Sequence, residues 1–265
     1  MDRIAKVIPV SQKVLSGPVF FSFNTNFQTH ASYNGRQYNG VQEKIRQEGA
    51  KAVMSPCITT PSMSLEERGQ QMAHKIEKAY MAQEQPQKLH LIGHSFAGVD
   101  LRAALSLYGA DRFCRSLTTI SSPHHGLSFI EQALLQQFSE EPEHVEPVLR
   151  ALGMSLKNYE EFSKLNMQDF NALAENMPGV CYHSMATRQM RDRVTPLMRH
   201  TYDIIHGQFT PLENDGLIVP EDCKWGNYLL TLDSDHLEVI GFNYHYNNLR
   251  AIQLAIDNIK VQEAC

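Results

Sequence analysis

A strand, a small-residue turn and a helix follow one another between positions 88 and 107, and this segment constrains the fold more than any other. The run from Lys88 to Ile92 is mostly apolar and is typical of a central strand. Gly93 to Ala97 supplies the turn, with Ser95 at its apex. A helix is predicted from Phe96 to Leu107, because apolar side chains recur there at helical spacing. The segment therefore predicts an α/β architecture in which a serine is held between a strand and a helix.

The turn has the composition that a nucleophilic serine requires. A serine hydroxyl is a weak nucleophile, so it must lie beside a base, at the start of a helix whose N–H groups face the reacting oxygen. Gly93 and Ala97 flank the turn, where we expect neighbouring backbone to leave no room for a larger side chain. Ala97 replaces the second glycine of the G-x-S-x-G pattern, and Gly98 follows it. A serine at an ordinary helix N-terminus gives a similar pattern, but the preceding strand favours a nucleophile elbow.

Strands and helices alternate along most of the remaining chain, and Ser64 with Glu67 forms a capping-box pattern before one of the helices. This alternation implies right-handed crossovers and a mostly parallel sheet with helices on both faces. Together with the elbow it predicts one α/β-hydrolase domain over residues 1–265. The other elements expected are strands at Pro18 to Phe23, Ala52 to Met54, Arg115 to Ile120 and Gly179 to Ser184, and helices at Val41 to Gln47, Leu65 to Gln83 and Tyr246 to Val261.

The alternation stops between Leu127 and Met177, where three helical segments with apolar stripes are expected. They run from Phe129 to Phe138, from Val145 to Leu152 and from Tyr159 to Leu173. We interpret residues 127–177 as a helical cap or lid inserted in the domain, above an apolar substrate pocket. Helices that pack on the domain without covering a site are the alternative.

Composition excludes several classes of protein. A net charge of -5 and a pI near 6.2 argue against nucleic acid as a partner, because such partners favour a basic surface. The five cysteines are widely spaced without a C-x-x-C pair, so neither a disulfide framework nor a zinc site is expected. No apolar run is long enough for a signal peptide core or a membrane span, which predicts a soluble, cytoplasmic protein. A secreted mature form would have the same appearance.

A carboxylate and a histidine follow the serine in the order that a serine hydrolase of this fold needs. Asp215 lies in the tight turn Asn214-Asp215-Gly216, and His236 lies in a later polar loop. In a triad, His236 would take the proton from Ser95, and Asp215 would hold the imidazole tautomer and stabilise the imidazolium.

Other residues compete for these roles. The alternative bases are His206 and His245, and the alternative acids are Asp222, Asp233 and Asp235. The adjacent His124 and His125 suggest a metal site, but a histidine pair that packs against its neighbours is the more common arrangement.

The motifs together resemble those of the bacterial triacylglycerol lipase family, that of the Pseudomonas, Burkholderia and Bacillus lipases, over nearly the whole chain. The matching pieces are Tyr38 to Glu43, Gln47 to Ala50, Glu67 to Gln71, Leu91 to Ser95, Ile120 to Gly126, Pro178 to Val180, Asn214 to Leu217 and Asp235 to Glu238. Each piece is short, but their order and spacing are specific. The resemblance implies that Ser95, Asp215 and His236 form the catalytic triad.

Two departures from that family concern the oxyanion hole and calcium. Relatives end their first strand with His-Gly, whereas Phe23 and Asn24 stand here, followed by Thr25. Asparagine tolerates left-handed backbone, so the turn is expected to survive, with the backbone N–H groups of Phe96 and Thr25 as oxyanion donors.

Many relatives hold a structural calcium near the histidine loop through an acidic residue and then a glutamine. Glu238 occupies the acidic position, but Phe242 stands where glutamine is expected. We therefore predict neither a metal nor a cofactor.

The leading hypothesis is a serine carboxylic-ester hydrolase of the lipase type, which cleaves acylglycerol-like lipid esters through an acyl-enzyme. Its partners would be the lipid ester substrate and, transiently, a lipid surface. A thioesterase or an acyltransferase would use the same triad. A degenerate hydrolase that binds a lipid or a protein partner is the remaining alternative, and its support is the altered oxyanion segment.

Overall fold

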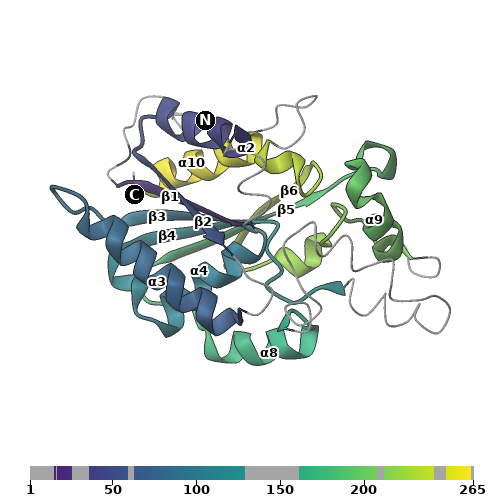
Figure 1. Ribbon diagram of the computed structural model, residues 1–265, viewed down its shortest axis with the longest axis horizontal. Helices are drawn as coiled ribbons and strands as arrows, with labels where there is room; N and C mark the ends of the chain where they lie inside the picture. Colours follow the sequence, from purple (N-terminus) through teal and green to yellow (C-terminus); the bar gives the residue numbers. More distant parts are fainter. Residues whose placement is uncertain are drawn as a thin grey trace, which may run out of the picture.

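A single parallel sheet organises the molecule (Figure 1). The computed structural model describes residues 15, 17–25, 36–58, 63–128, 161–207, 212–241 and 249–263. Within these residues, six strands lie in the order β2-β1-β3-β4-β5-β6, and all neighbouring pairs are parallel. The strands are β1 (Val19–Thr25), β2 (Ala52–Ile58), β3 (Leu89–His94), β4 (Cys114–Ile120), β5 (Cys181–Arg188) and β6 (Asn227–Asp233). The predicted fold class is therefore confirmed.

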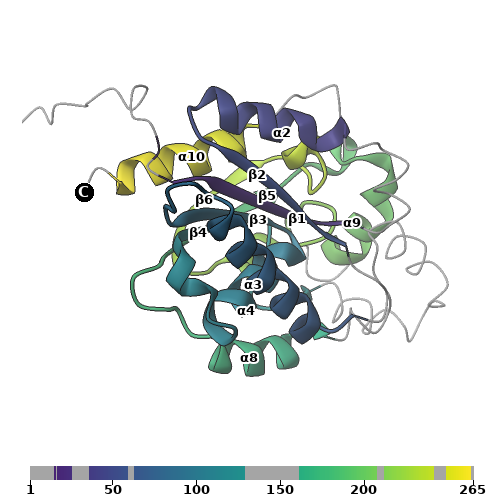
Figure 2. The ribbon, with the colours of Figure 1, turned by 60° about the vertical axis from the view of Figure 1, so that its left-hand side comes forward.

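Helices cover both faces of this sheet (Figures 1 and 2). The chain moves outward from β1 to β2 and then returns past β1 to β3, so right-handed crossovers place the intervening helices on opposite faces. Between β1 and β3 the strand order reverses, and sites in open α/β sheets form at the carboxyl ends of strands beside such a reversal. The helices are α2 (Arg36–Gln47) and α10 (Arg250–Gln262) on one face, and α3 (Leu65–Met81) and α4 (Phe96–Leu107) on the other.

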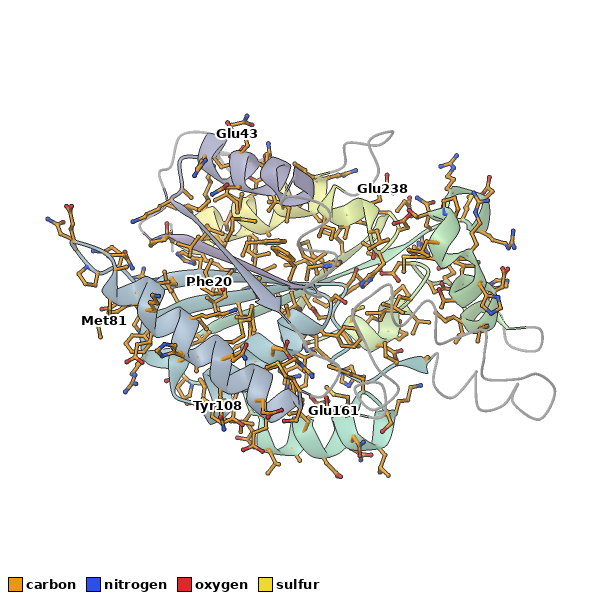
Figure 3. The ribbon with its side chains drawn as sticks, in the orientation of Figure 1. Phe20, Glu43, Met81, Tyr108, Glu161 and Glu238 are labelled. Carbon is orange, nitrogen blue, oxygen red and sulfur yellow. The ribbon has the colours of Figure 1, made fainter. Side chains whose placement is uncertain are left out.

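The side chains of β1 alternate between two apolar cores. Val19, Phe21 and Phe23 pack with residues of α2 and α10. Phe20 points to the opposite face and packs with α3 and α4 (Figure 3). Such two-sided burial is typical of central parallel strands, and every residue of β3 is buried as well.

Several element boundaries match the prediction. Helix α4 spans the expected residues, and α3 begins at the predicted capping box, in which Glu67 N–H donates to Ser64 Oγ at 3.2 Å and Ser64 N–H donates to Glu67 Oε2 at 2.7 Å. Strand β6 and helix α9 (Arg199–His206) were not predicted. Most residues of β6 are only half-buried at the sheet edge, so the strand lacks a strong apolar pattern.

The described end of the predicted cap packs against α4. Helix α8 (Lys164–Leu173) lies within the expected third helical segment. Arg102 of α4 donates through Nη2 to Ala174 O at 3.0 Å, and Ser106 Oγ donates to Glu175 O at 2.7 Å. Residues 129–160, which include the first two expected helices, lie outside the described residues. Of the described helices, none combines the length and the apolar character that crossing a membrane requires.

Candidate active site

Ser95 lies at a strained turn between β3 and α4. Its φ of 59° and ψ of -138° are unusual for a residue with a side chain, and its N–H is held by Ile120 O at 3.0 Å. Such backbone conformations cost about 1–3 kcal/mol each and persist where the surrounding structure imposes them. A Cβ at Gly93 would lie 2.6 Å from Gly98 Cα, and one at Gly98 would lie 2.1 Å from Ser122 Oγ. The tight position after the serine is therefore Gly98 and not Ala97, which explains why alanine is accepted there.

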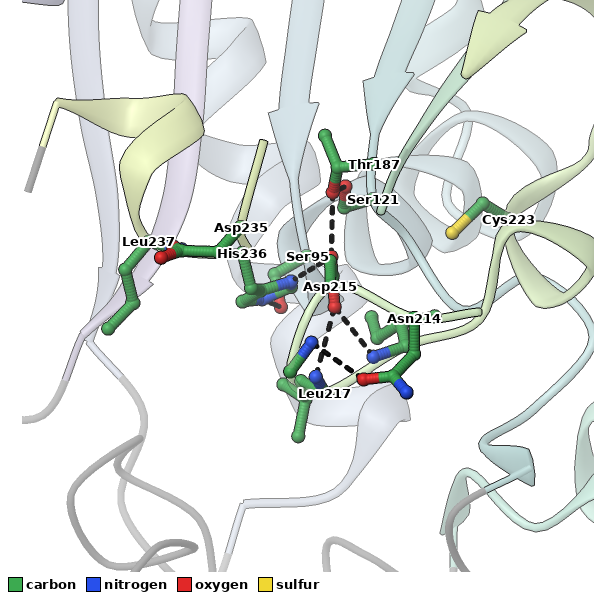
Figure 4. Close-up of polar contacts among 12 residues, drawn as sticks. Ser95, Ser121, Thr187, Asn214, Asp215, Leu217, Cys223, Asp235, His236 and Leu237 are labelled. Carbon is green, nitrogen blue, oxygen red and sulfur yellow. Dashed lines mark hydrogen bonds and ion pairs between the residues drawn. The ribbon is translucent and has the colours of Figure 1, made fainter. Parts of the chain in front are cut away.

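Ser95, His236 and Asp215 form one hydrogen-bonded chain (Figure 4). Ser95 Oγ lies 2.9 Å from His236 Nε2, and His236 Nδ1 lies 2.9 Å from Asp215 Oδ2. Since an ionised carboxylate only accepts, Nδ1 carries the proton toward Asp215 and Nε2 accepts from the serine hydroxyl. All three residues are buried, so little water competes for these contacts. The structure thus brings together the three residues that the sequence singled out.

The turn around Asp215 fixes its carboxylate. Asp215 Oδ1 accepts the N–H groups of Leu217 and Ile218 at 3.0 and 2.8 Å. Gly216 follows with φ of 99°, in the left-handed region, and donates its N–H to Asn214 Oδ1 at 2.8 Å. The Asn-Asp-Gly sequence is therefore the local reason why the acid is presented in one orientation.

His94, the residue before Ser95, contacts both the backbone and the ring of His236. Its Nε2 donates to His236 O at 3.0 Å, and the centroids of the two imidazole rings lie 4.6 Å apart. Burial lowers the pKa of His94 well below its ordinary value, and the nearby His236 acts in the same direction. The ring is therefore a neutral donor at neutral pH. No role for His94 was predicted from the sequence, although its position directly before Ser95 is a signal that could have indicated one.

No family model matches the chain. Triacylglycerol lipase 2 of Saccharomyces cerevisiae is 29% identical over 77% of this chain and 61% of its own length. The chain thus spans about three fifths of that relative.

Solved structures of bacterial lipases share the fold. The mature form of a Bacillus licheniformis lipase superposes with a TM-score of 0.69 at 19% identity, covering 92% of this chain and 96% of that one. Lipase 1 of Pelosinus fermentans gives 0.62 at 14% identity, over 91% of this chain and 98% of that one. A metagenomic carboxyl esterase superposes with a TM-score of 0.67 at 16% identity, covering 98% of this chain and 80% of that one. The chain shares the fold of these bacterial enzymes.

Asp235 forms hydrogen bonds with other groups and does not orient the imidazole of His236. Its Oδ2 accepts the N–H and the hydroxyl of Thr195 at 2.8 and 2.7 Å. Its Oδ1 accepts the N–H groups of Leu237 and Glu238 at 2.8 and 2.7 Å. Asp235 therefore ties the loop that carries His236 to a neighbouring segment.

The remaining alternative acids are also placed elsewhere. Asp222 accepts the N–H of Ser128 at 2.8 Å, beside the start of the predicted cap. The side chain of Asp233 is 81% exposed and pairs with Arg188. Of the acids considered, Asp215 is the one that contacts the imidazole of His236.

His206, one of the two alternative bases, has no hydrogen bond to Ser95 in the described part of the chain. His206 Nδ1 lies 3.2 Å from Leu212 O at the end of α9. His245 lies outside the described residues.

The histidine pair at 124 and 125 packs against protein groups, as the alternative interpretation held. His124 is buried between Arg102 and Thr119, and His125 Nε2 lies 2.8 Å from Lys224 O. Across the described residues, no three acidic, histidine or cysteine side chains are grouped so as to hold a metal ion.

Glu238, at the acidic position of the relatives' calcium site, faces inward. Its Oε2 accepts from Ser234 Oγ at 3.2 Å and from Asp235 N–H at 3.3 Å. Burial raises the pKa of this carboxyl. Phe242 lies outside the described residues.

The two predicted oxyanion donors have different local structures. Phe96 is the first residue of α4, where a backbone N–H has no acceptor within its own helix. Asn24 and Thr25 are extended and pair with Cys57 and Ile58, so the expected left-handed turn at Asn24 is wrong. Regular pairing with β2 carries β1 through Thr25. The role of Thr25 N–H stays a prediction.

Proposed function

We propose that this chain is a serine carboxylic-ester hydrolase of the lipase type that cleaves acylglycerol-like esters through an acyl-enzyme. The observation that carries the proposal is the continuous contact from Ser95 through His236 to Asp215, built at a strained elbow on an α/β-hydrolase sheet. The sequence similarity to a yeast protein named as a triacylglycerol lipase supports the substrate class.

The geometry accounts for both halves of the reaction. His236 Nε2 takes the Ser95 proton as Oγ forms a bond to the ester carbonyl carbon, and Asp215 stabilises the resulting imidazolium. The imidazolium then gives this proton to the departing alcohol, whose bond to the acyl carbon breaks. Water enters, loses a proton to His236 and releases the fatty acid, and the proton returns to Ser95.

The oxyanion of each tetrahedral intermediate needs preorganised donors. We assign the N–H of Phe96, at the positive end of α4, and the N–H of Thr25 to this role. Neither donor requires a metal or a cofactor for this chemistry.

Three apolar residues that are close in sequence to the triad residues belong to one apolar cluster, which supports a lipid substrate. Phe96 follows Ser95, Leu217 follows Asp215 by two residues, and Leu237 follows His236. These three side chains pack in one apolar cluster, together with Phe162 at the described end of the proposed cap. An acyl chain that enters this cluster leaves water, at a gain of about 0.8 kcal/mol per buried methylene.

A fluorophosphonate probe and a panel of acyl esters and thioesters test the proposal. We expect the probe to label the wild-type chain at Ser95, and hydrolysis to favour esters of medium or long acyl chains. Ser116→Ala, which removes another buried serine hydroxyl that contacts a histidine, should still be labelled. Thioesters hydrolysed faster than matched esters would favour the thioesterase alternative. Absence of both labelling and hydrolysis would leave the lipid-binding alternative in place.

A further inference from the structure

We propose that Thr187 is a positioning residue for the reaction, whose hydroxyl holds the second oxygen of Asp215 in the plane that His236 requires. Thr187 lies near the carboxyl end of β5. Strand β4 lies between β5 and β3, the strand that leads into Ser95. Its Oγ1 donates to Asp215 Oδ2 at 2.7 Å, the same oxygen that lies 2.9 Å from His236 Nδ1 (Figure 4). The assignment of the reaction as ester hydrolysis rests on the proposed function, whereas the contacts between Thr187, Asp215 and His236 do not depend on it.

The carboxylate of Asp215 needs this third support because it is wholly buried. The two backbone N–H groups of its own turn hold Oδ1 and leave Oδ2 between Thr187 and His236. With Thr187 in place, both oxygens have a fixed donor besides the imidazole, so rotation about Cβ–Cγ would break a hydrogen bond. The hydroxyl also stabilises a buried negative charge, which costs free energy unless it is hydrogen-bonded.

Ser121 directs the Thr187 hydroxyl. Ser121 Oγ and Thr187 Oγ1 are hydrogen-bonded, and Thr187 gives its single proton to the carboxylate, so Ser121 is the donor between the two hydroxyls. Ser121 follows β4 with φ of 47°, the second side-chain-bearing residue with positive φ in the described part of the chain. The first is Ser95, which follows β3. Since β3 and β4 are paired parallel strands, the two serines lie at the same edge of the sheet.

Thr118 of β4 provides a matched control. It is a buried strand threonine like Thr187, but its hydroxyl has no hydrogen-bond partner among the described residues. Thr187→Val and Thr118→Val make the same change of shape, and only Thr187→Val removes a hydrogen bond. Thr187→Ser keeps the hydroxyl and tests for rescue.

The experiment measures kcat and KM for a soluble ester, and the downfield NMR resonance of the proton between His236 Nδ1 and Asp215, assigned by its loss in His236→Ala. We expect Thr187→Val to lower kcat about tenfold, as for loss of one hydrogen bond to a charged group, with KM little changed. Its downfield resonance should shift or broaden. Thr187→Ser should restore most of the kcat and the position of the downfield resonance. Thr118→Val should match the wild type in both measurements.

Two results would overturn the proposal. One is an unchanged kcat and resonance in Thr187→Val, and the other is an equal loss in Thr118→Val, which would assign the effect to shape. If Thr187→Val does not fold, Thr187→Ala gives the same reading with less bulk. If the wild-type chain hydrolyses no ester and resists the probe, the proposed function fails, but the resonance still reports whether Thr187 positions Asp215.

Discussion

The two ends of the sheet each carry a serine, a histidine and an acid joined by hydrogen bonds. At the carboxyl end, Ser95 contacts His236 and His236 contacts Asp215, both at 2.9 Å. At the amino end, Ser116 Oγ lies 2.8 Å from His90 Nδ1, and His90 Nε2 lies 2.9 Å from Glu263 Oε1. In residue types and distances the two groups are nearly the same.

The backbone around each serine is what differs. Ser116 lies inside β4, paired with His90 of β3 on one side and with Cys181 of β5 on the other. Inside a parallel sheet the backbone N–H groups donate to carbonyl groups of neighbouring strands, so they are not available to an oxyanion. Ser95 lies beyond the end of β3, with positive φ and the free N–H groups of a helix start beside it.

The comparison teaches that a hydrogen-bonded serine, histidine and acid do not by themselves make a nucleophile. The Ser95 group also adjoins an apolar cluster and the proposed oxyanion donors, whereas the Ser116 group links the end of helix α10 to the sheet through His90 and Glu263. The following predictions test this difference, from the largest expected effect to the smallest.

Removal of each serine hydroxyl should separate the two groups most clearly. We expect Ser95→Ala to lower ester turnover at least about 10⁴-fold, because covalent catalysis is lost, with the fold intact. Ser116→Ala should stay within a few-fold of the wild type. Initial rates and circular dichroism of both variants decide the matter, and comparable losses of turnover would refute the distinction.

The histidines should differ in the same direction. His236→Ala should be nearly as damaging as Ser95→Ala, and Asp215→Asn should lower turnover by orders of magnitude, since triad members act as a unit. His90→Gln should cost stability and leave turnover per folded molecule unchanged. Active-site titration with the fluorophosphonate probe corrects for the folded fraction, and a large loss of corrected turnover in His90→Gln would contradict us.

The acids that hold each histidine-bearing segment should differ in a measurable way. Asp235→Asn places an amide NH₂ against N–H donors, so we expect the free energy of unfolding to fall by about 1–3 kcal/mol, with reduced turnover. Glu263→Gln keeps one acceptor for His90 and should lower stability less, with turnover unchanged. Urea denaturation and initial rates test both. A harmless Asp235→Asn would show that this anchor is dispensable.

The smallest effect concerns pH. Burial lowers the pKa of His90 below 6.5, and it lowers the pKa of His94 further. A histidine whose folded-state pKa is depressed contributes stability above its unfolded pKa and loses it as pH falls below that value. The urea midpoint should therefore be lower at pH 5.5 than at pH 7.5, since these histidines titrate from about 6.5 downward. His90→Gln should flatten this dependence, and an unchanged slope would count against a neutral His90.

Local patterns predicted the elements with strong signals. Helix α4 spans the expected residues, and the capping box places the start of α3, because both depend on contacts within a few residues. Strand β6 escaped prediction, since its half-buried residues alternate weakly. The left-handed turn expected at Asn24 was wrong because pairing with β2 keeps the backbone extended.

The sequence by itself determined the order of strand, serine, acid and histidine, and the small residues that the elbow demands. Only the tertiary structure decided that Asp215, and not Asp235, contacts His236, since both carboxylates lie in suitable loops and their choice depends on contacts between distant segments. It also decided that Gly98 is the crowded position and that Thr187 and His94 support the site. The physical reason is that side chains at the ends of adjacent parallel strands meet only when the sheet has assembled.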